Sequence, residues 1–300
     1  MTYKERFAGY RKMTEETLER LLSEKKAFAE IPELLLSAMR YSVMAGGKRL
    51  RPCLLLGTVD MLQGPMEEAL VPAASLEMIH TYSLIHDDLP GMDDDDYRRG
   101  RLTNHKVYGT GQAILAGDAL LNGAYECMLQ NALRYPAHLD RHVRAVSAIA
   151  GRAGTAGMIA GQSLDLLNEK TENPSLETLR YIHTHKTADL LTAPLEAAAF
   201  LSGAGEAELA ALRKFGYNCG IAFQIDDDIL DVVGDAAVLG KKTGMDEARG
   251  KMTWPSLMGL EEAKAESRRL WTEAKDVLSV FGDRADFLRS FADETSGRQF

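Results

Sequence analysis

Apolar side chains recur every three or four residues through most of this chain, and this spacing decides what it can fold into. In PELLLSAMRYSVMAGG, for example, Leu35, Met39 and Val43 fall on one face of a helix. Similar apolar stripes run through residues 67–86, 111–133, 187–203, 209–233 and 254–278. Alternating runs typical of strands are scarce, and glycine or proline residues separate the stripes. The sequence therefore predicts an all-α fold with roughly ten or more helices.

No linker or change of composition divides the 300 residues. There is no Gly/Ser-rich or Pro-rich stretch, no low-complexity segment and no repeat with a clear period. The hydrophobic content of 45% is enough to bury a large core. Length alone would suggest about two domains, but we expect a single domain over residues 1–300.

The charge and cysteine content exclude several classes of protein. A net charge of −9 argues against nucleic-acid binding and against a basic membrane-surface protein. Cys53, Cys127 and Cys219 lie far apart without metal-ligand spacing, which is typical of a reducing cytoplasm. The sequence has no signal-peptide pattern at its start and no window of about 18 uncharged apolar residues. We therefore expect a soluble cytoplasmic protein without a membrane span.

The acidic residues are concentrated in two clusters, of which the second lies in FQIDDDILDVVGD. On a helix, Asp227 and Asp231 share a face because they are four residues apart, and Asp228 joins that face. The flanking residues are apolar, so these like charges would repel each other in a buried setting. No Lys or Arg lies between Lys214 and Lys241. A divalent cation would compensate the charge, and carboxylate oxygens suit Mg²⁺ or Ca²⁺ better than zinc.

The first cluster lies in HDDLPGMDDDDYRRG, where Asp87 and Asp88 end an apolar stripe. On a continuous helix Asp93 would be rotated by about 240° from Asp87, but Pro90 excludes a regular helix interior. A two-residue excursion over residues 89–92 would return Asp93 to the place of an i+4 carboxylate. A single acidic run is often only a solvated helix end, whereas two such clusters in apolar helices favour a metal site.

Basic residues lie beside the first cluster and in several short motifs. Arg98 and Arg99 follow the aspartates directly, and arginine binds phosphate through a planar fork. Both arginines could therefore hold a phosphate group whose other side binds metal, and they need not neutralise the aspartates. GGKRLRP, HTHKT, LGKKTG and GKMTWP add further basic residues. Each lysine alone is more often a surface residue, but together they indicate that the chain binds polyanions.

In these motifs the chain resembles the trans-isoprenyl diphosphate synthases, and most closely the bacterial farnesyl diphosphate synthases. The resemblance runs from GGKRLRP to GKMTWPSLMGL and rests on DDLPGMD, DDDYRRG, GMIAGQSLDL, HTHKT and DDILD in that order. It implies an isoprenoid synthase-type orthogonal helical bundle around a deep central cavity, in a homodimer. It also implies a short-chain prenyltransferase that condenses isopentenyl diphosphate with dimethylallyl or geranyl diphosphate. Ionisation of the allylic diphosphate, condensation and proton loss would then give farnesyl diphosphate.

The resemblance also implies a role for each matching residue. The expected metal ligands are Asp87, Asp88, Asp93, Asp227, Asp228 and Asp231, holding Mg²⁺ (about three ions per site with diphosphate bound, with Mn²⁺ as a substitute). The isopentenyl diphosphate site is matched by Lys48, Arg51, His80 and Arg99. The allylic diphosphate and its ionising carbon are matched by Arg98, Lys186, Thr187, Gln224, Lys241 and Lys251. The expected catalytic set is Asp87, Asp88, Asp93, Lys186, Thr187, Gln224 and Asp227, and Asp165 is expected to line the cavity.

Two residues before the first cluster are expected to set the product length. In the family, side chains just before the first aspartates form the floor of the cavity, and here these are Tyr82 and Ser83. Tyr82 would lie about 7.5 Å along the helix from Asp87. A tyrosine at this position resembles the fifteen-carbon synthases, whereas a small residue would suggest a twenty-carbon product. The alternative is that Tyr82 only packs in the core.

The sequence departs from the family pattern in three places. Asp226 adds a fourth acid to the second cluster, and Trp254 stands where tyrosine is common. The C-terminal segment FADETSGRQF is polar, and we expect it to fray.

Other functions stay open beside a farnesyl diphosphate synthase. A geranyl or geranylgeranyl diphosphate synthase would share all of these motifs. A class I terpene cyclase needs one diphosphate, so the set matched to isopentenyl diphosphate argues against it, as does DDILD as the second motif. A non-catalytic subunit would keep the fold, but both aspartate motifs are intact.

Overall fold

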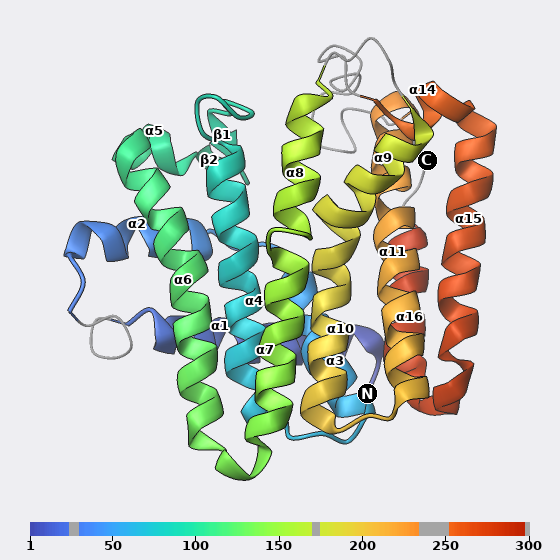
Figure 1. Cartoon of the computed structure of the whole chain (residues 1–300), viewed down its shortest axis with the longest axis horizontal. Helices are drawn as coiled ribbons and strands as arrows, with labels where there is room; N and C mark the ends of the chain where they lie inside the picture. The colour runs from blue at the N-terminus through green and yellow to red at the C-terminus, as the bar shows by residue number, and fades with distance from the viewer. Residues whose placement is uncertain (24–29, 170–174, 234–251, 298–300) are drawn as a thin grey trace. The chain divides into compact units, whose positions relative to one another are not determined.

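The computed structural model describes residues 1–23, 30–169, 175–233 and 252–297. Helices make up almost all of the secondary structure in these ranges (Figure 1), which confirms the predicted all-α class. The chain forms two compact units, residues 1–147 with 200–203 and residues 148–199 with 204–300. A single domain over residues 1–300 stays a prediction. Within the described ranges, no helix combines the length and the apolar character needed to cross a membrane.

The first unit is built around a long buried helix. Its helices are α1 (Tyr3–Leu21), α2 (Glu33–Val43), α3 (Leu50–Met61), α4 (Met66–Asp87), α5 (Asn104–Tyr108), α6 (Thr110–Arg134), the short 3₁₀ helix η1 (Pro136–His138) and the first part of α7 (Leu139–Ala153). α4 packs against α1, α2, α3 and α6, and it runs beside α6 in Figure 1. It is buried on nearly all sides, as expected for a helix that is apolar around its whole circumference. α4 ends at Asp87, so the first aspartate cluster begins where the core helix stops.

A small hairpin follows this cluster. The strands β1 (Tyr97–Arg98) and β2 (Arg101–Leu102) pair antiparallel. Arg99 and Gly100 form the two-residue turn, with φ angles of 53° and 74°. Positive φ at both central residues matches the twist of paired strands. The hairpin therefore fixes the backbone positions of the two arginines of DDDYRRG, Arg98 and Arg99.

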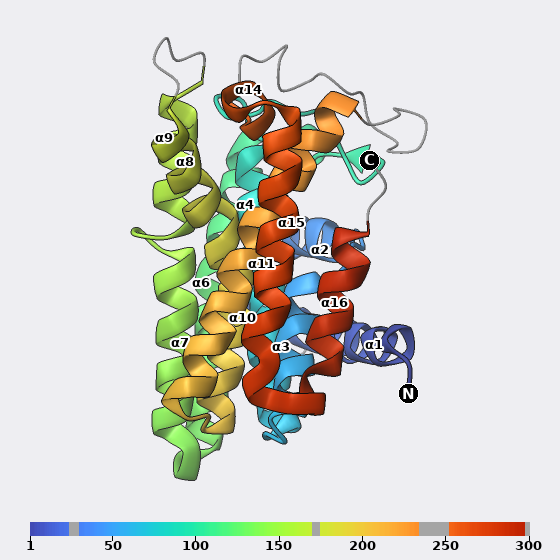
Figure 2. The same ribbon diagram turned by 90° about the vertical axis from the view of Figure 1, so that its right-hand side faces the viewer.

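The second unit contains the remaining helices. They are the rest of α7, α8 (Met158–Leu167), α9 (Leu176–Ile182), the π-helical turn η2 (His183–Ala188), most of α10 (Asp189–Ser202), α11 (Glu206–Val233), α14 (Trp254–Met258), α15 (Leu260–Asp276), the 3₁₀ segment η3 (Val277–Ala285) and α16 (Asp286–Ser296). α11 carries the second aspartate cluster and packs against η2, α15 and α16 (Figure 2). The cluster thus lies in a continuous helix that is buried over much of its length.

Glycines let two helices approach the π-helical turn closely. A Cβ atom at Gly161 of α8 would lie 2.2 Å from the backbone nitrogen of Lys186. A Cβ atom at Gly220 of α11 would lie 2.3 Å from the Cα atom of Ala188. Neither position leaves room for a side chain, so these glycines allow α8 and α11 to pack closely against η2.

The C-terminal segment differs from its prediction. α16 continues to Ser296, with Phe287, Leu288, Phe291 and Thr295 among its buried residues. The expectation that FADETSGRQF frays is therefore wrong up to Ser296. The reason is that Phe291 and Thr295 continue an apolar stripe that starts before this segment, at Phe287.

Candidate active site

The loop after α4 returns Asp93 to the end of that helix. The backbone N–H of Asp93 donates to the carbonyl oxygen of Asp87 over 2.8 Å, and Met92 N–H donates to Leu89 O over 3.0 Å. Gly91 has a φ of 94°, a conformation that favours glycine. Residues 89–92 therefore form the excursion that the sequence predicts, and Asp87 and Asp93 lie at the same end of α4, both half-buried.

Arg98 is paired with Asp88, which differs from the expectation that it need not neutralise an aspartate. Its Nε lies 2.7 and 3.0 Å from the two carboxylate oxygens, and its Nη2 lies 2.5 Å from Oδ1. Asp88 is buried, and burial raises the pKa of its carboxyl although Arg98 acts in the opposite direction. A buried carboxylate without a partner is costly, which explains why the nearest arginine turns toward it.

Arg99 turns instead toward the GGKRLRP loop. Its guanidinium donates to the carbonyl oxygen of Gly46. A Cβ atom at Gly47 would lie 2.8 Å from the Cζ atom of Arg99, so this guanidinium needs the glycine. The exposed Lys48 belongs to the same loop. The structure thus brings one arginine of DDDYRRG against the double glycine of GGKRLRP.

Arg51 and His80 are both influenced by the positive charge of Arg99. Burial, with a smaller contribution from Arg99, lowers the pKa of Arg51 to about 10, although Glu77 acts in the opposite direction. Burial also lowers the pKa of His80 far below its ordinary value, and Arg51 and Arg99 act in the same direction. Neither of these two arginines forms an ion pair with a carboxylate among the described residues, and the Nε of Arg51 is buried without a hydrogen bond. A neutral imidazole and two arginines without carboxylate partners suit an anionic ligand.

The two residues expected to form the floor lie on α4. Tyr82 is buried, and its ring meets that of His86 edge to face, with centroids 5.6 Å apart. Burial raises the pKa of Tyr82 to about 12, with smaller contributions from Tyr125 and Asp87. The hydroxyl of Ser83 donates to the carbonyl oxygen of His80 over 2.9 Å, so it is turned back to its own helix.

In the second cluster, Asp226 points toward α15. Its buried carboxylate accepts hydrogen bonds from the hydroxyl of Ser267 and, over 2.8 Å, from the indole N–H of Trp271. The fourth acid noted in the sequence therefore joins α11 to α15. This leaves Asp227, Asp228 and Asp231 as the candidate ligands of α11.

Both carboxylate oxygens of Asp228 accept hydrogen bonds from the protein. Oδ1 accepts from Gln224 Nε2 over 3.3 Å, and Oδ2 accepts from the backbone N–H of Trp254 over 2.9 Å. Asp228 and Asp231 are buried, whereas Asp227 is half-buried. Among the three, Asp227 has the most accessible side chain.

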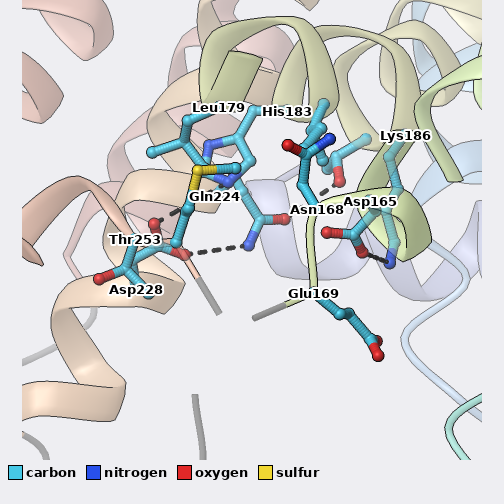
Figure 3. A pocket seen from close by; sticks show the side chains of 12 residues that line it. Asp165, Asn168, Glu169, Leu179, His183, Lys186, Gln224, Asp228 and Thr253 are labelled. Atoms are coloured by element: carbon cyan, nitrogen blue, oxygen red, sulfur yellow. Dashed lines mark hydrogen bonds and ion pairs between the residues drawn. The ribbon is translucent and has the colours of Figure 1, made fainter. Parts of the chain in front are cut away.

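A cavity of about 100 Å³ lies in the second unit between α8, η2 and α11 (Figure 3). Lys186 donates to Asp165 over 2.5 Å, and Thr187 donates to Gln224 over 3.0 Å. Both donors are carried by η2, and π-helical turns occur frequently at functional sites. Together with Asp228 these residues line the cavity, so the structure brings together five residues that the sequence singles out.

His183 is a residue that the sequence analysis missed. It lines the same cavity, and burial lowers its pKa to about 3, so the ring is neutral at neutral pH. The indole N–H of Trp254 donates to its Nδ1 over 2.8 Å. An indole is only a donor, so the ring proton of His183 lies on Nε2, which is 3.9 Å from Oδ2 of Asp228. The sequence feature that could have pointed to His183 is its partner Trp254, which stands where tyrosine is common in the family.

The aspartates fit a particular kind of metal site. Across the described ranges, no three His, Cys, Asp or Glu side chains form a closed metal-binding group. Mg²⁺ usually binds to one or two carboxylates together with waters and phosphate oxygens, and needs no such group. Half-buried aspartates offer oxygen ligands of this type in each unit, Asp87 and Asp93 in the first and Asp227 in the second. The expected residues Lys241 and Lys251 lie outside the described residues.

Comparisons with known proteins give a consistent result. The sequence model of the polyprenyl synthetase family matches residues 32–279. A dimethylallyltranstransferase of Fischerella ambigua is 48% identical over 262 residues, which cover 87% of this chain and 75% of the relative. A geranylgeranyl diphosphate synthase of Cyanophora paradoxa is 44% identical over 262 residues, with 87% of each chain covered.

Solved structures agree with the sequence relatives. An FPP/GFPP synthase of Zymomonas mobilis superimposes with a TM-score of 0.83 at 36% identity, covering 96% of this chain and 98% of the other. A geranyltransferase of Legionella pneumophila gives a TM-score of 0.86 at 32% identity, with 99% and 96% covered. The expected isoprenoid synthase-type all-α fold is thereby confirmed. The chain belongs to the polyprenyl synthetase family.

Proposed function

We propose that this prenyltransferase extends dimethylallyl and geranyl diphosphate with isopentenyl diphosphate and stops at farnesyl diphosphate. The observation that carries the proposal is the buried ring of Tyr82, five residues before Asp87 on α4. Five residues of helix span about 7.5 Å. A prenyl chain that grows along α4 from a diphosphate held at Asp87 meets this aromatic ring, which limits its length.

The residues on the allylic side have separate tasks. Asp87, Asp93 and Asp227 would hold Mg²⁺, which when bound supplies positive charge to the leaving diphosphate. Lys186 and Thr187 lie on η2 at the cavity and would bind the diphosphate and orient the ionising carbon. The reaction needs no protein nucleophile, because the double bond of isopentenyl diphosphate attacks the carbocation.

The isopentenyl side is supported by the basic group in the first unit. Arg51 and Arg99 both act electrostatically on His80, and Lys48 belongs to the loop that Arg99 contacts. A diphosphate would supply Arg51 and Arg99 with the negative charge that no carboxylate among the described residues supplies through an ion pair. This second anion site argues for a condensing enzyme and against a terpene cyclase, which needs one diphosphate.

A geranylgeranyl diphosphate synthase is the second candidate. The relatives from Cyanophora paradoxa and Capsicum annuum carry that name, at 44% and 45% identity. These names favour a twenty-carbon product, whereas the tyrosine at position 82 favours fifteen carbons. The two candidates share every expected metal ligand. They differ in whether the side chain at the cavity floor stops the growing chain at fifteen carbons.

The deciding experiment is a product assay. Purified protein is incubated with Mg²⁺, isopentenyl diphosphate and, separately, the C5, C10 and C15 allylic diphosphates, and product length is measured. We expect the C5 and C10 primers to be extended and growth to stop at C15. Tyr82→Ala should lengthen the product, while Tyr82→Phe, which keeps the ring, should leave it unchanged.

Each other outcome has a clear meaning. Extension of the C15 primer by the unmodified protein would replace the farnesyl assignment by the geranylgeranyl one. An unchanged product from Tyr82→Ala would make Tyr82 a packing residue. If no primer reacts, a terpene cyclase or a non-catalytic subunit becomes the better assignment.

We also infer that the protein acts as a homodimer in the cytoplasm. Large apolar side chains are exposed on α6 and at the start of α7, among them Leu115, Leu129, Leu133 and Val143. A face of this kind on a soluble protein favours an interface. Light scattering should give twice the chain mass, and Leu129→Asp should reduce it, whereas Val280→Asp at an exposed site of η3 should not.

A further inference from the structure

A fully buried ion pair lies beside the basic group of the first unit. Arg49 Nη1 donates to Glu77 Oε1 over 2.7 Å, and the two side chains are 1% and 2% exposed. A second guanidinium nitrogen, Nη2, donates to the carbonyl oxygen of Val43 over 2.7 Å. Arg49 has a left-handed backbone with a φ of 53°, at the start of α3. The pair thus ties the end of α2 and the GGKRLRP loop to α4.

Glu77 is within electrostatic reach of more than one arginine. It lies three residues before His80 on α4, which is about one helical turn. Its carboxylate raises the pKa values of both Arg51 and Arg99, against the lowering by burial. Yet among the described residues it forms a hydrogen-bonded ion pair with Arg49 and with neither of the other two.

We propose that Arg49 is a positioning residue that keeps Glu77 occupied, so that Arg51 and Arg99 stay available for a diphosphate. A buried carboxylate that loses its partner has a strong tendency to find another cation. Without Arg49, this carboxylate still acts on the guanidinium groups of Arg51 and Arg99, which are proposed to bind isopentenyl diphosphate. The carboxylate would then compete with the substrate for them. The inference rests on the proposed function, because it concerns the same anion site.

Three variants test this competition. Arg49→Gln releases Glu77 and should raise the KM for isopentenyl diphosphate by about tenfold. The KM for geranyl diphosphate should change by less than about twofold, because that substrate does not depend on Arg51 and Arg99. The double variant Arg49→Gln/Glu77→Gln removes the competing charge as well, and its KM for isopentenyl diphosphate should return to within about threefold of the original.

A matched control separates positioning from simple stability. Glu68 is a second buried carboxylate of α4, and it accepts hydrogen bonds from His138 and His142, each over 2.9 Å. Glu68→Gln also disturbs a buried polar pair of this helix, but lies away from the basic group. It should lower the melting temperature without changing either KM.

Binding of inorganic pyrophosphate, measured by calorimetry without turnover, makes the two proposals distinguishable. Weaker binding to Arg49→Gln and recovery in the double variant would support the inference even if no prenyl product forms. Equal loss in the single and the double variant would overturn it, and so would a parallel rise of both KM values. If Arg49→Gln does not fold, Arg49→Met, which is also neutral, replaces it in the same comparison, and an unchanged pyrophosphate affinity would then overturn the inference.

Discussion

The two aspartate clusters have similar sequences but are held in different ways. After α4, the backbone sets the arrangement, because the N–H of Asp93 bonds to the carbonyl oxygen of Asp87 across a loop. In α11, regular helix continues through the cluster, and Asp226 and Asp228 accept hydrogen bonds from segments farther along the chain. Asp226 is held by Ser267 and Trp271. The first cluster depends on a turn and the second on partners distant in sequence.

This difference shows that a run of aspartates is not a set of equivalent ligands. In the first cluster Asp88 turns inward to Arg98, while Asp87 and Asp93 stay half-buried at the helix end. In the second cluster Asp226 and Asp228 accept hydrogen bonds from protein donors, and Asp227 stays half-buried. Each cluster therefore contains acids that support the structure and acids that are accessible for a metal.

The largest effect should come from the accessible acids. Asp87→Ala and Asp227→Ala should each reduce kcat by about a thousandfold or more, because the leaving diphosphate loses metal-held charge stabilisation. Steady-state turnover with geranyl and isopentenyl diphosphate measures this, and thermal unfolding serves as the control. Turnover within about tenfold of the original protein would refute the assignment of these two residues.

The next effect should separate neighbours in one cluster. Asp226→Ala leaves the buried donors of Ser267 and Trp271 without their acceptor and should lower the free energy of unfolding by about 2–4 kcal/mol. Its kcat below the melting temperature should stay within about threefold of the original. Denaturant unfolding and turnover are measured on the same preparation. A large loss of kcat without loss of stability would make Asp226 a metal ligand.

Part of the arrangement of the two aspartate clusters could be predicted from the sequence. Pro90 excludes a helix interior, so the return of Asp93 follows from local backbone rules. The common face of Asp227 and Asp231 follows from helical spacing alone. Tyr82 could be placed on the helix that ends at the first cluster for the same reason.

The rest depends on contacts between segments far apart in the chain. Nothing near Asp226 indicates that its partners are Ser267 and Trp271. Arg98 could equally bind a phosphate or an aspartate, because the same planar fork fits both. Glu77 could not be recognised as the partner of Arg49, since 28 residues separate them and the segments of both contain other candidate site residues.

The pH dependence of unfolding tests the role of His183, the buried histidine beside Asp228 of the second cluster. Burial lowers the pKa of His183 from 6.5 to about 3, so the folded protein binds fewer protons than the unfolded chain between these values. Its contribution to stability is therefore complete above pH 6.5 and is lost as the pH falls toward 3, by at most about 1.4 kcal/mol per pH unit. Unfolding of His183→Gln without metal should show a shallower pH dependence, and parallel curves for the two proteins would contradict this.

The smallest effect should come from the two tryptophans that reach the second cluster. Trp254→Phe removes the donor to His183 and loosens the surroundings of Asp228, so half-saturation with Mg²⁺ should need roughly threefold more metal. Trp271→Phe is the matched control, because its indole bonds to Asp226 on the α15 side. Both variants should lose about 1 kcal/mol of stability. If both change the Mg²⁺ dependence equally, the indole of Trp254 has no special relation to the metal-binding acids, and the distinction between supporting and accessible aspartates in α11 loses its basis.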